Sequence, residues 1–378
     1  MIDPRVLEKM NIYMTREYGN AASNEHAFGW NANEAVNIAR EKISNSINCS
    51  PNEIYFTSGA TESNNLAILG SINLQSDNSH IISLKTEHKS VIDIFNYASI
   101  NNINTTLLNV KQDGMIDLDI FEKSITSNTK LVSIMMANNE IGVIQPIPEI
   151  SRICKKHNVI LHVDAAQALG KIKFDLINLD IDLMSLSAHK IYGPKGIGAL
   201  YVNRKTMKNR IKSITYGGGH ENGLRPGTLP VHNIVGFGEA CEIIYNEIND
   251  NTSLITELTD LMLQSLNNGY PGFILNGHSK IRIPGNLNIS FPDLKEEPLI
   301  QRLRKIAVSS GSACTTSSPE PSHVLSALGI NNRLINSTIR IGIGKFNTIN
   351  DIKDAANYIL KVVNKLKIKK NIKMVKKD

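Results

Sequence analysis

The sequence predicts an α/β protein with a mainly parallel sheet, followed by a second, smaller α/β domain. Between about residues 33 and 201, segments of helical periodicity alternate with short apolar runs rich in β-branched residues. Runs such as LVSIMMA and GALYV are almost entirely apolar, as expected of strands buried on both faces of a parallel sheet. The chain, at 378 residues, also exceeds the ~250–300 residues at which single cores stop growing. We therefore expect two domains.

The elements of the large domain follow in a regular order. Residues 34–47 form an amphipathic helix, IYFTSG is a strand and turn, and ATESNNLAILGSI is helical. HIISL is a strand, SVIDIFNYA a helix and TTLLNV a strand. LVSIMMA, VILHVD, DLMSLSA and GALYV follow as strands with helical segments between them. Ligands collect at the carboxyl ends of strands in such sheets, so the residues at those ends are the candidates for function.

The second domain is indicated by a change in the pattern of predicted helices and strands after about residue 245. A long helical stretch, EIIYNEINDNTSLITELTDLMLQSL, leads into the strand NLNISF and another helix. A Ser/Thr/Gly-rich loop at 309–322, STIRIGIG and a C-terminal helix complete it. We expect a large domain over 1–247 and a small C-terminal domain over 248–378.

Composition points to a globular protein of the cytoplasm. Hydrophobic residues make up 41% and charged residues 20%, and no apolar run approaches the ~20 residues of a membrane span. The N-terminus, MIDPRVLEKM, is charged where a signal peptide is apolar. The net charge of +6 is concentrated in the lysine-rich end of the chain. Such a tail can attract acidic partners, but a solvated helix end is favoured, and we expect no direct nucleic-acid contact.

Four cysteines, at Cys49, Cys154, Cys241 and Cys314, lie far apart without a C-x-x-C pair. This spacing argues against a disulfide framework and against a tetrahedral zinc site. The first three fit small buried hydrophobes. Cys314 lies in SSGSACTTSSPEPSHVL, which lacks apolar periodicity and predicts a mobile surface loop. An exposed cysteine of this kind can act as a thiolate nucleophile.

Polar residues follow two neighbouring predicted strands. Lys190 comes directly after the strand SLSA, where its amine could form a Schiff base with an aldehyde cofactor. Asp164 follows VILHV, where a carboxylate could keep a pyridinium nitrogen protonated, and Gln167 is spaced to reach the ring's phenolic oxygen. A surface lysine beside a turn and an N-capping aspartate explain the same residues when each is taken alone.

An anion site is predicted at TSGATESNN, residues 57–65, where a strand turns through glycine into a helix starting at Thr61. The backbone N–H groups of that start and the helix dipole suit a phosphate, although a plain helix cap fits as well. His88, in TEHKS, could stack on a flat ring, and a structural histidine is the alternative. ANNEIG places Asn138 and Asn139 after a further strand.

Eight separated segments resemble, in the same order, those of the class V aminotransferase family. They are FTSGATESNNLAI, TEHKSV, NNEIGV, HVDAAQ, SAHKIYGPKGIGALYV, GGGHENGLRPGT, AVSSGSACTTSSPEPSHVL and STIRIGIG. Within the family, the chain resembles the long-loop, housekeeping cysteine desulfurases of iron–sulfur cluster assembly. The resemblance implies the fold type I of pyridoxal-phosphate-dependent transferases, with pyridoxal 5'-phosphate as cofactor.

The resemblance also implies roles for individual residues. Lys190, Cys314 and His88 would be catalytic, and no metal is implied in the resting enzyme, with Cys314 a transient iron–sulfur ligand. Asn139 and Arg340 would hold the substrate carboxylate, a task that suits a planar guanidinium. Thr228 would reach the phosphate of a neighbouring subunit, so a homodimer is implied. The implied cofactor-binding residues are Ala60, Thr61, His88, Asn139, Asp164, Gln167, Ser187, His189, Lys190 and Thr228.

The implied activity converts L-cysteine to L-alanine and leaves the sulfur as a persulfide on Cys314. An iron–sulfur scaffold protein or another sulfur acceptor would receive it, with tRNA thiolation as a second destination. Two departures from the family stand out: the chain starts at Met1 without the family's first strand, and a lysine tail replaces its C-terminal extension. The missing strand predicts either impaired activity or stability or a misassigned start codon, and the lysine tail argues against docking of the scaffold at the C-terminus.

Other functions stay open at this point. Selenocysteine lyase or another pyridoxal-phosphate reaction would use the same fold, although an aminotransferase would have no use for the loop cysteine. A non-catalytic partner or scaffold is an alternative if the missing strand abolishes activity. A nucleotide-binding protein is disfavoured, because neither GPKGIG nor YGGGH has the spacing of a P-loop or a dinucleotide fingerprint.

Overall fold

The computed structural model describes residues 1–72, 78–207, 210–294, 298–310 and 321–367. These residues divide into two compact units. The first contains Met1–Lys111, Met115–Asn139 and Val143–Asp250, and the second contains Gln112–Gly114, Glu140–Gly142 and the described residues from Asn251 onward. Among the described helices, none has both the length and the apolar character required to cross a membrane. The domain boundary expected between 247 and 248 stays a prediction.

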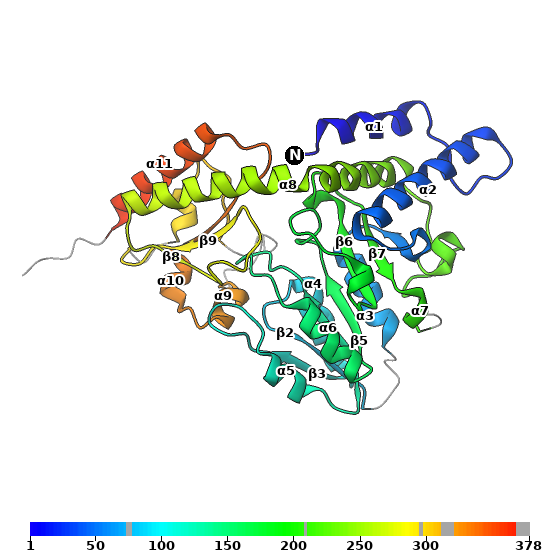
Figure 1. Cartoon of the computed structure of the whole chain (residues 1–378), viewed down its shortest axis with the longest axis horizontal. Coiled ribbons are helices and arrows are strands. Elements are labelled where there is room, and N and C mark those ends of the chain that lie inside the picture. Colours follow the sequence, from blue (N-terminus) through cyan, green and yellow to red (C-terminus); the bar gives the residue numbers. More distant parts are fainter. Residues whose placement is uncertain (73–77, 208–209, 295–297, 311–320, 368–378) are drawn as a thin grey trace, which may run out of the picture. The chain divides into compact units, whose positions relative to one another are not determined.

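Seven described strands form the sheet of the first unit (Figure 1). In spatial order they are β1 (Ile54–Thr57), β7 (Gly198–Val202), β6 (Leu183–Ser187), β5 (Ile160–Asp164), β4 (Thr129–Met135), β2 (His80–Leu84) and β3 (Asn104–Leu108). Strand β7 is antiparallel to both of its neighbours, and all other pairs are parallel. Because two antiparallel pairings separate β1 from β6, these two strands run in the same direction.

This topology brings the carboxyl ends of β1, β2, β4, β5 and β6 to one edge of the sheet. Every residue of β2, β5, β6 and β7 is buried, which explains the continuous apolar runs in the sequence. The expected mainly parallel sheet is therefore present, with β7 as its one antiparallel strand among the described residues.

In the first unit, helices pack against the sheet and against one another. Their bounds are α1 (Pro4–Thr15), α2 (Ala27–Ile47), α3 (Ala60–Ser71), α4 (Lys89–Ile100), α5 (Leu118–Ser124), α6 (Ile147–Lys156) and α7 (Arg204–Met207). Short 3-10 turns lie at η1 (Pro51–Glu53), η2 (Leu176–Asn178), η3 (Ala188–Lys190) and η4 (His220–Gly223). Helix α3 packs against β6, β7 and α4, and its Leu66 and Ile68 share a core cluster with Phe95 of α4.

Local sequence chemistry explains where several helices begin. Asp3 caps α1 by accepting a hydrogen bond from the Arg5 N–H, and Pro4 occupies the first turn, where a missing N–H costs nothing. Helix α2 begins at Ala27, seven residues before the amphipathic pattern that predicted it. Its first turns carry exposed aromatic residues, which hid the helical periodicity in the sequence.

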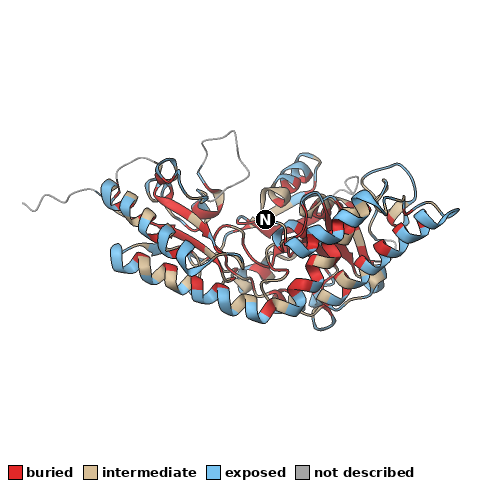
Figure 2. Cartoon of the chain, turned by 90° about the horizontal axis from the view of Figure 1, so that it is seen from above, coloured by how far each residue is buried: buried red, intermediate tan, exposed pale blue. Residues whose placement is uncertain are grey.

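The second unit contains a three-stranded antiparallel sheet among its described residues, in the order β10 (Thr338–Gly342), β9 (Asn286–Ser290) and β8 (Ile274–Leu275). The later part of α8 (Val231–Gly269) packs there with α11 (Ile349–Leu366), and η5 (Leu299–Arg302), α9 (His323–Ala327) and α10 (Asn332–Asn336) complete the unit. Leu258, Leu266, Phe291, Ile339 and Ile359 lie in its core. Figure 2 shows the buried inner faces of these helices and their exposed outer faces.

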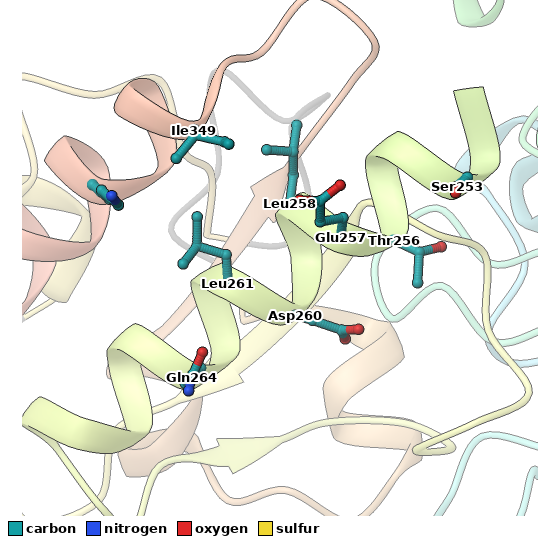
Figure 3. Close-up of a pocket in the computed structure, with 9 residues that line it drawn as sticks. Ser253, Thr256, Glu257, Leu258, Asp260, Leu261, Gln264 and Ile349 are labelled. Carbon is teal, nitrogen blue, oxygen red and sulfur yellow. The ribbon is translucent and has the colours of Figure 1, made fainter. Parts of the chain in front are cut away.

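A surface hollow of about 720 Å³ lies in the second unit between α8 and the start of α11 (Figure 3). Leu258, Leu261 and Ile349 supply its apolar surface, and Glu257 and Asp260 supply carboxylates. Of the described residues that line it, none belongs to the predicted site.

Candidate active site

The predicted site residues of the first unit gather at the carboxyl edge of its sheet. Asp164 is the last residue of β5, and Ser187 is the last residue of the neighbouring strand β6. The 3-10 turn η3 follows Ser187 directly and ends at Lys190. His88 and Asn139 follow β2 and β4 by a few residues, and Ala60 opens the helix after β1. The common direction of these five strands thus places residues from five segments of the chain at one edge.

Asp164 is almost fully buried and receives two hydrogen bonds. Its Oδ1 accepts from the Ala166 N–H at 2.9 Å, and its Oδ2 accepts from Asn64 Nδ2 at 2.8 Å. The residue is 5% exposed. Both carboxyl oxygens accept hydrogen bonds, which is the only role that an ionised carboxylate can take. The two contacts hold the carboxyl group in a fixed orientation at the strand end.

Asn64 extends this contact to a second part of the site. Its Nδ2 also donates to Ser90 Oγ at 2.9 Å. Ser90 Oγ in turn lies 2.9 Å from His88 Nδ1, and the Ser90 N–H donates to the same nitrogen at 3.1 Å. His88 is the N-cap residue of α4 and uses that nitrogen as the capping acceptor. Neither Asn64 nor Ser90 was predicted as a site residue, although both lie inside the motifs FTSGATESNNLAI and TEHKSV.

Glu87 lies beside this group and is completely buried. Its Oε1 accepts a hydrogen bond from the Met135 N–H at 2.8 Å. Burial raises the pKa of Glu87 well above its usual range, and the charge of Asp164 raises this pKa further. The fold therefore disfavours the charged form of Glu87 beside Asp164.

The turn after β1 forms an open cradle at the start of α3. Gly59 has a φ of 152°, and a Cβ there would meet no described atom within 4 Å. Among the described residues, no side chain caps this helix. Gly198 of β7 approaches so closely that a Cβ on it would lie 2.7 Å from Gly59 Cα. The helix start, with Ala60 and the exposed Thr61, thus presents backbone N–H groups next to the end of β6.

The end of β6 adds positive charge and donors next to this cradle. Ser187 Oγ lies 3.0 Å from His189 Nδ1. Burial, together with the charges of Lys190 and Lys195, lowers the pKa of His189. Both His189 and Lys190 are exposed on the surface of this chain. This set of a hydroxyl, an imidazole and two ammonium groups is suited to an anionic ligand.

Asn138 and Asn139, which both follow the same predicted strand in the sequence, lie in different environments. Asn138 is buried and donates to the Thr86 carbonyl at 2.8 Å, which makes it a structural residue. Asn139 is half-buried at the sheet edge. Gln167 follows Asp164, is half-buried, and its Oε1 accepts from Lys171 Nζ at 2.6 Å.

Thr228 is exposed in a segment that ion pairs anchor to the rest of the unit. The nearly buried Glu221 accepts from Arg40 of α2 at 2.7 and 3.0 Å and from the Phe56 N–H at 2.7 Å. Arg225 pairs with Glu62 of α3 at 2.8 Å. Two separate ion pairs therefore hold the segment that carries Thr228.

Arg340 belongs to the second unit, at the centre of β10. Its backbone pairs with Ser309, with N–H to O distances of 2.7 and 3.2 Å, at the start of the 309–322 segment. Near the end of that segment, Ser322 Oγ donates to Glu140 Oε2 at 2.5 Å. Burial raises the pKa of Glu140, against the opposing effects of Ser322 and of the charges on His323 and Arg340.

Cys314 lies outside the described residues. Burial raises the thiol pKa of each of the other cysteines, Cys49, Cys154 and Cys241, to about 12. Cys154 and Cys241 are buried as expected, whereas Cys49 is only partly buried. Because the thiolate is the nucleophile, the raised pKa disfavours these three cysteines as nucleophiles near neutral pH.

The chain belongs to the aminotransferase class-V family, whose model matches residues 1–354. A cysteine desulfurase, IscS of Neisseria meningitidis serogroup A, is 48% identical over 367 residues, which cover 97% of this chain and 90% of the relative. A solved structure titled NIFS-like protein matches with a TM-score of 0.89 and 36% identity over 97% of each chain. The structure titled "SspA in complex with cysteine" matches with a TM-score of 0.82 and 34% identity over 92% of this chain and 97% of its own.

These comparisons confirm the resemblance to class V cysteine desulfurases and the expected α/β fold of type I. They cover nearly the whole chain, in agreement with the eight motifs spread along it.

Proposed function

We propose that this chain is a pyridoxal-phosphate-dependent cysteine desulfurase. The reaction takes the sulfur of L-cysteine onto the Cys314 thiolate and leaves L-alanine and a Cys314 persulfide. The observation that carries the proposal is the buried Asp164 carboxylate, fixed by two donors at the strand end next to that of Lys190. The similarity to cysteine desulfurases over 97% of the chain supports the choice of reaction.

The donors and charges at the sheet edge fit pyridoxal phosphate. When bound, this cofactor supplies an electron sink for the substrate's α-carbon. Asp164 would pair with the pyridinium nitrogen, His88 would lie against the ring, and Gln167 would contact the phenolic oxygen. The open start of α3 with Ala60 and Thr61, together with Ser187 and His189, would bind the phosphate.

Different residues of the chain would then carry out separate steps of the reaction. Lys190 would attach the cofactor, and its amine would remove and return the proton at the substrate α-carbon. Asn139 and Arg340 would bind the substrate carboxylate. Cys314 would attack the substrate sulfur, so that an S–S bond forms while the substrate C–S bond breaks. An iron–sulfur scaffold or another sulfur acceptor would receive the persulfide.

A homodimer is part of this proposal. Thr228 is exposed on an anchored segment, where it could reach the phosphate site of a second copy. Large apolar side chains are also exposed along α1, α2 and the segment between them: Leu7, Met14, Tyr18, Phe28 and Trp30. Exposed apolar surface of this extent is typical of a protein interface.

The test of the cofactor assignment is reduction of the purified holoenzyme with borohydride, followed by peptide mapping. The label should appear on Lys190 and be absent from a Lys190→Ala variant. Lys195, five residues further along the same turn, is the matched control, since Lys195→Ala should still be labelled at Lys190. Label on another lysine, or no visible cofactor band at all, would exclude the proposed role of Lys190.

A further inference from the structure

We propose that Asn64 and Ser90 are positioning residues that join Asp164 to His88 through one directed chain of hydrogen bonds, which fixes His88 as the tautomer protonated on Nε2. The inference deepens the proposed function, on which it rests, because Asp164 and His88 would lie at the nitrogen and the face of the cofactor ring.

The direction of the chain begins at Asp164. An ionised carboxylate only accepts, so the group 2.8 Å from its Oδ2 must be the amide nitrogen of Asn64 and not its oxygen. This fixes the orientation of the Asn64 amide. The second hydrogen of Nδ2 then points to Ser90 Oγ at 2.9 Å, so Ser90 Oγ is an acceptor in that contact.

The next two contacts determine the proton on His88. With its oxygen accepting from Asn64, the Ser90 hydroxyl has its own hydrogen to donate to His88 Nδ1 at 2.9 Å. The Ser90 backbone N–H, which can only donate, points to the same nitrogen at 3.1 Å. A ring nitrogen that receives these donors carries no hydrogen, so the proton of the neutral ring is on Nε2.

The burial of Asn64 supports a role beyond stability. Its side chain is completely buried, yet Oδ1 has no hydrogen-bond partner within the described part of the chain. An unsatisfied buried acceptor costs stability. Asn64 is retained despite this loss of stability, and both hydrogens of its Nδ2 are donated, one to Asp164 and one to Ser90. Burial raises the pKa of the adjacent Glu87, which disfavours a second negative charge beside Asp164.

The chemical consequence is that His88 can offer an N–H hydrogen only from Nε2. Protonation at Nδ1 is opposed by the two donors and by the positive end of α4, which His88 caps. Asp164, although separated from His88 by two side chains, therefore influences the orientation and protonation of the imidazole.

The test is nitrogen-15 NMR of histidine-labelled full-length protein, with the His88 signal assigned by its loss in His88→Gln. The Nδ1 shift should be that of an unprotonated ring nitrogen and the Nε2 shift that of a protonated one. Asn64→Ala and Ser90→Ala should each move both shifts, and Ser90→Thr, which keeps the hydroxyl, should restore them. Both alanine variants should also bind the cofactor roughly tenfold more weakly, as expected for loss of orientation at a charged partner.

Matched controls come from exposed positions on α4. Ser99→Ala and Asn96→Ala should leave the His88 shifts and the cofactor affinity unchanged. A His88 proton on Nδ1, an unchanged His88 signal in Asn64→Ala, or equal behaviour of Ser90→Ala and Ser90→Thr would overturn the inference. If Asn64→Ala does not fold, the two Ser90 variants decide the question.

Failure of the proposed function would look different. The NMR measurement can be made on cofactor-free protein, where it reports the hydrogen-bond chain alone. Protein that shows the expected tautomer but develops no visible band with pyridoxal phosphate would contradict the cofactor assignment and leave the chain intact.

Discussion

At the scale of single residues, burial sets which acidic groups near the site carry charge. Asp164 receives two hydrogen bonds and stays an acceptor, whereas Glu87 has its pKa raised by complete burial and by the neighbouring Asp164. The fold therefore disfavours a charge on Glu87 beside the Asp164 carboxyl group at the sheet edge. Two adjacent charged carboxylates would repel each other and disturb a single site for a pyridinium ion.

The raised pKa of Glu87 predicts a specific dependence of stability on pH. Above the unfolded-chain pKa of about 4.3, the folded protein keeps a proton that the unfolded chain has released. Stability is therefore lost as pH rises toward the folded pKa, by about 1.4 kcal/mol per pH unit. Glu87→Gln removes this loss, so the free energy of unfolding of the variant should increase relative to the native protein as pH rises.

The measurement is denaturant unfolding of cofactor-free protein between pH 5 and pH 8, a range chosen to lie above the unfolded pKa. The control is Glu8→Gln, at an exposed position on α1. Its free energy of unfolding should differ from that of the native protein by the same amount at every pH. If the free energy of unfolding of Glu87→Gln also differs from the native value by the same amount at every pH, then the fold does not raise the pKa of Glu87.

At the scale of elements, ion pairs hold the segment that carries Thr228. Glu221 is 2% exposed at its side chain and joins the segment to Arg40 of α2 and to the Phe56 N–H of β1. Arg225 joins it to Glu62, whose carboxylate also accepts from the Ser58 N–H at 2.5 Å at the predicted phosphate turn. The segment and the phosphate turn are thus linked through one carboxylate.

Breaking the buried pair should be costly. Glu221→Ala leaves the partly buried Arg40 guanidinium without its carboxylate partner and removes the acceptor for the Phe56 N–H, so the free energy of unfolding should fall by about 3–5 kcal/mol. The matched control is Glu149→Ala, which removes an exposed pair with Arg152 and should cost less than about 1 kcal/mol. Chemical denaturation measures both, and equal losses would show that the Glu221 pair has no special role.

The strand ends could be predicted from the sequence because buried parallel strands are recognisable as apolar runs followed by polar residues. Asp164 and Lys190 were located in this way, before any of their contacts was known. Ser187 was predicted only from the family resemblance. Asn64 was not identified, because its contact with Asp164 joins residues 100 positions apart. Glu87 was missed for a related reason: a glutamate in a polar motif gives no sign that packing will bury it completely.

Helix α8 shows a second limit of pattern reading. The helical periodicity was read from about residue 242, whereas the helix begins at Val231. Gly236 and Gly238 interrupt the pattern, but both are needed for packing. A Cβ on Gly236 would lie 2.6 Å from Met10 Sδ, and one on Gly238 would lie 2.6 Å from Ala39 Cα. Close approach to α1 and α2 thus explains glycines that discourage a helix prediction.

At the scale of the whole molecule, the proposed homodimer would complete each cofactor site with Thr228 from the other chain. This sharing predicts complementation between damaged chains. Dimers of Lys190→Ala or of Thr228→Ala alone have both sites altered, whereas a mixed dimer has one site with both residues intact. Random exchange of equal amounts should therefore restore about a quarter of native activity, since half of the dimers are mixed.

The measurement is alanine formation from L-cysteine after unfolding and refolding the two variants together. The control is a mixture of separately refolded variants, which cannot exchange chains. Activity that does not rise above this control would show that the cofactor sites are not shared.

The central claim is that Cys314 receives the sulfur, and a cysteine pulse followed by alkylation and mass spectrometry tests it most directly. The peptide spanning 309–322 should gain one sulfur atom at Cys314 and lose this gain in Cys314→Ser, which should still bind the cofactor. Cys49, Cys154 and Cys241, with thiol pKa values of about 12, should stay unmodified. Sulfur on any of these three, or sulfur retained by the 309–322 peptide of Cys314→Ser, would contradict the account.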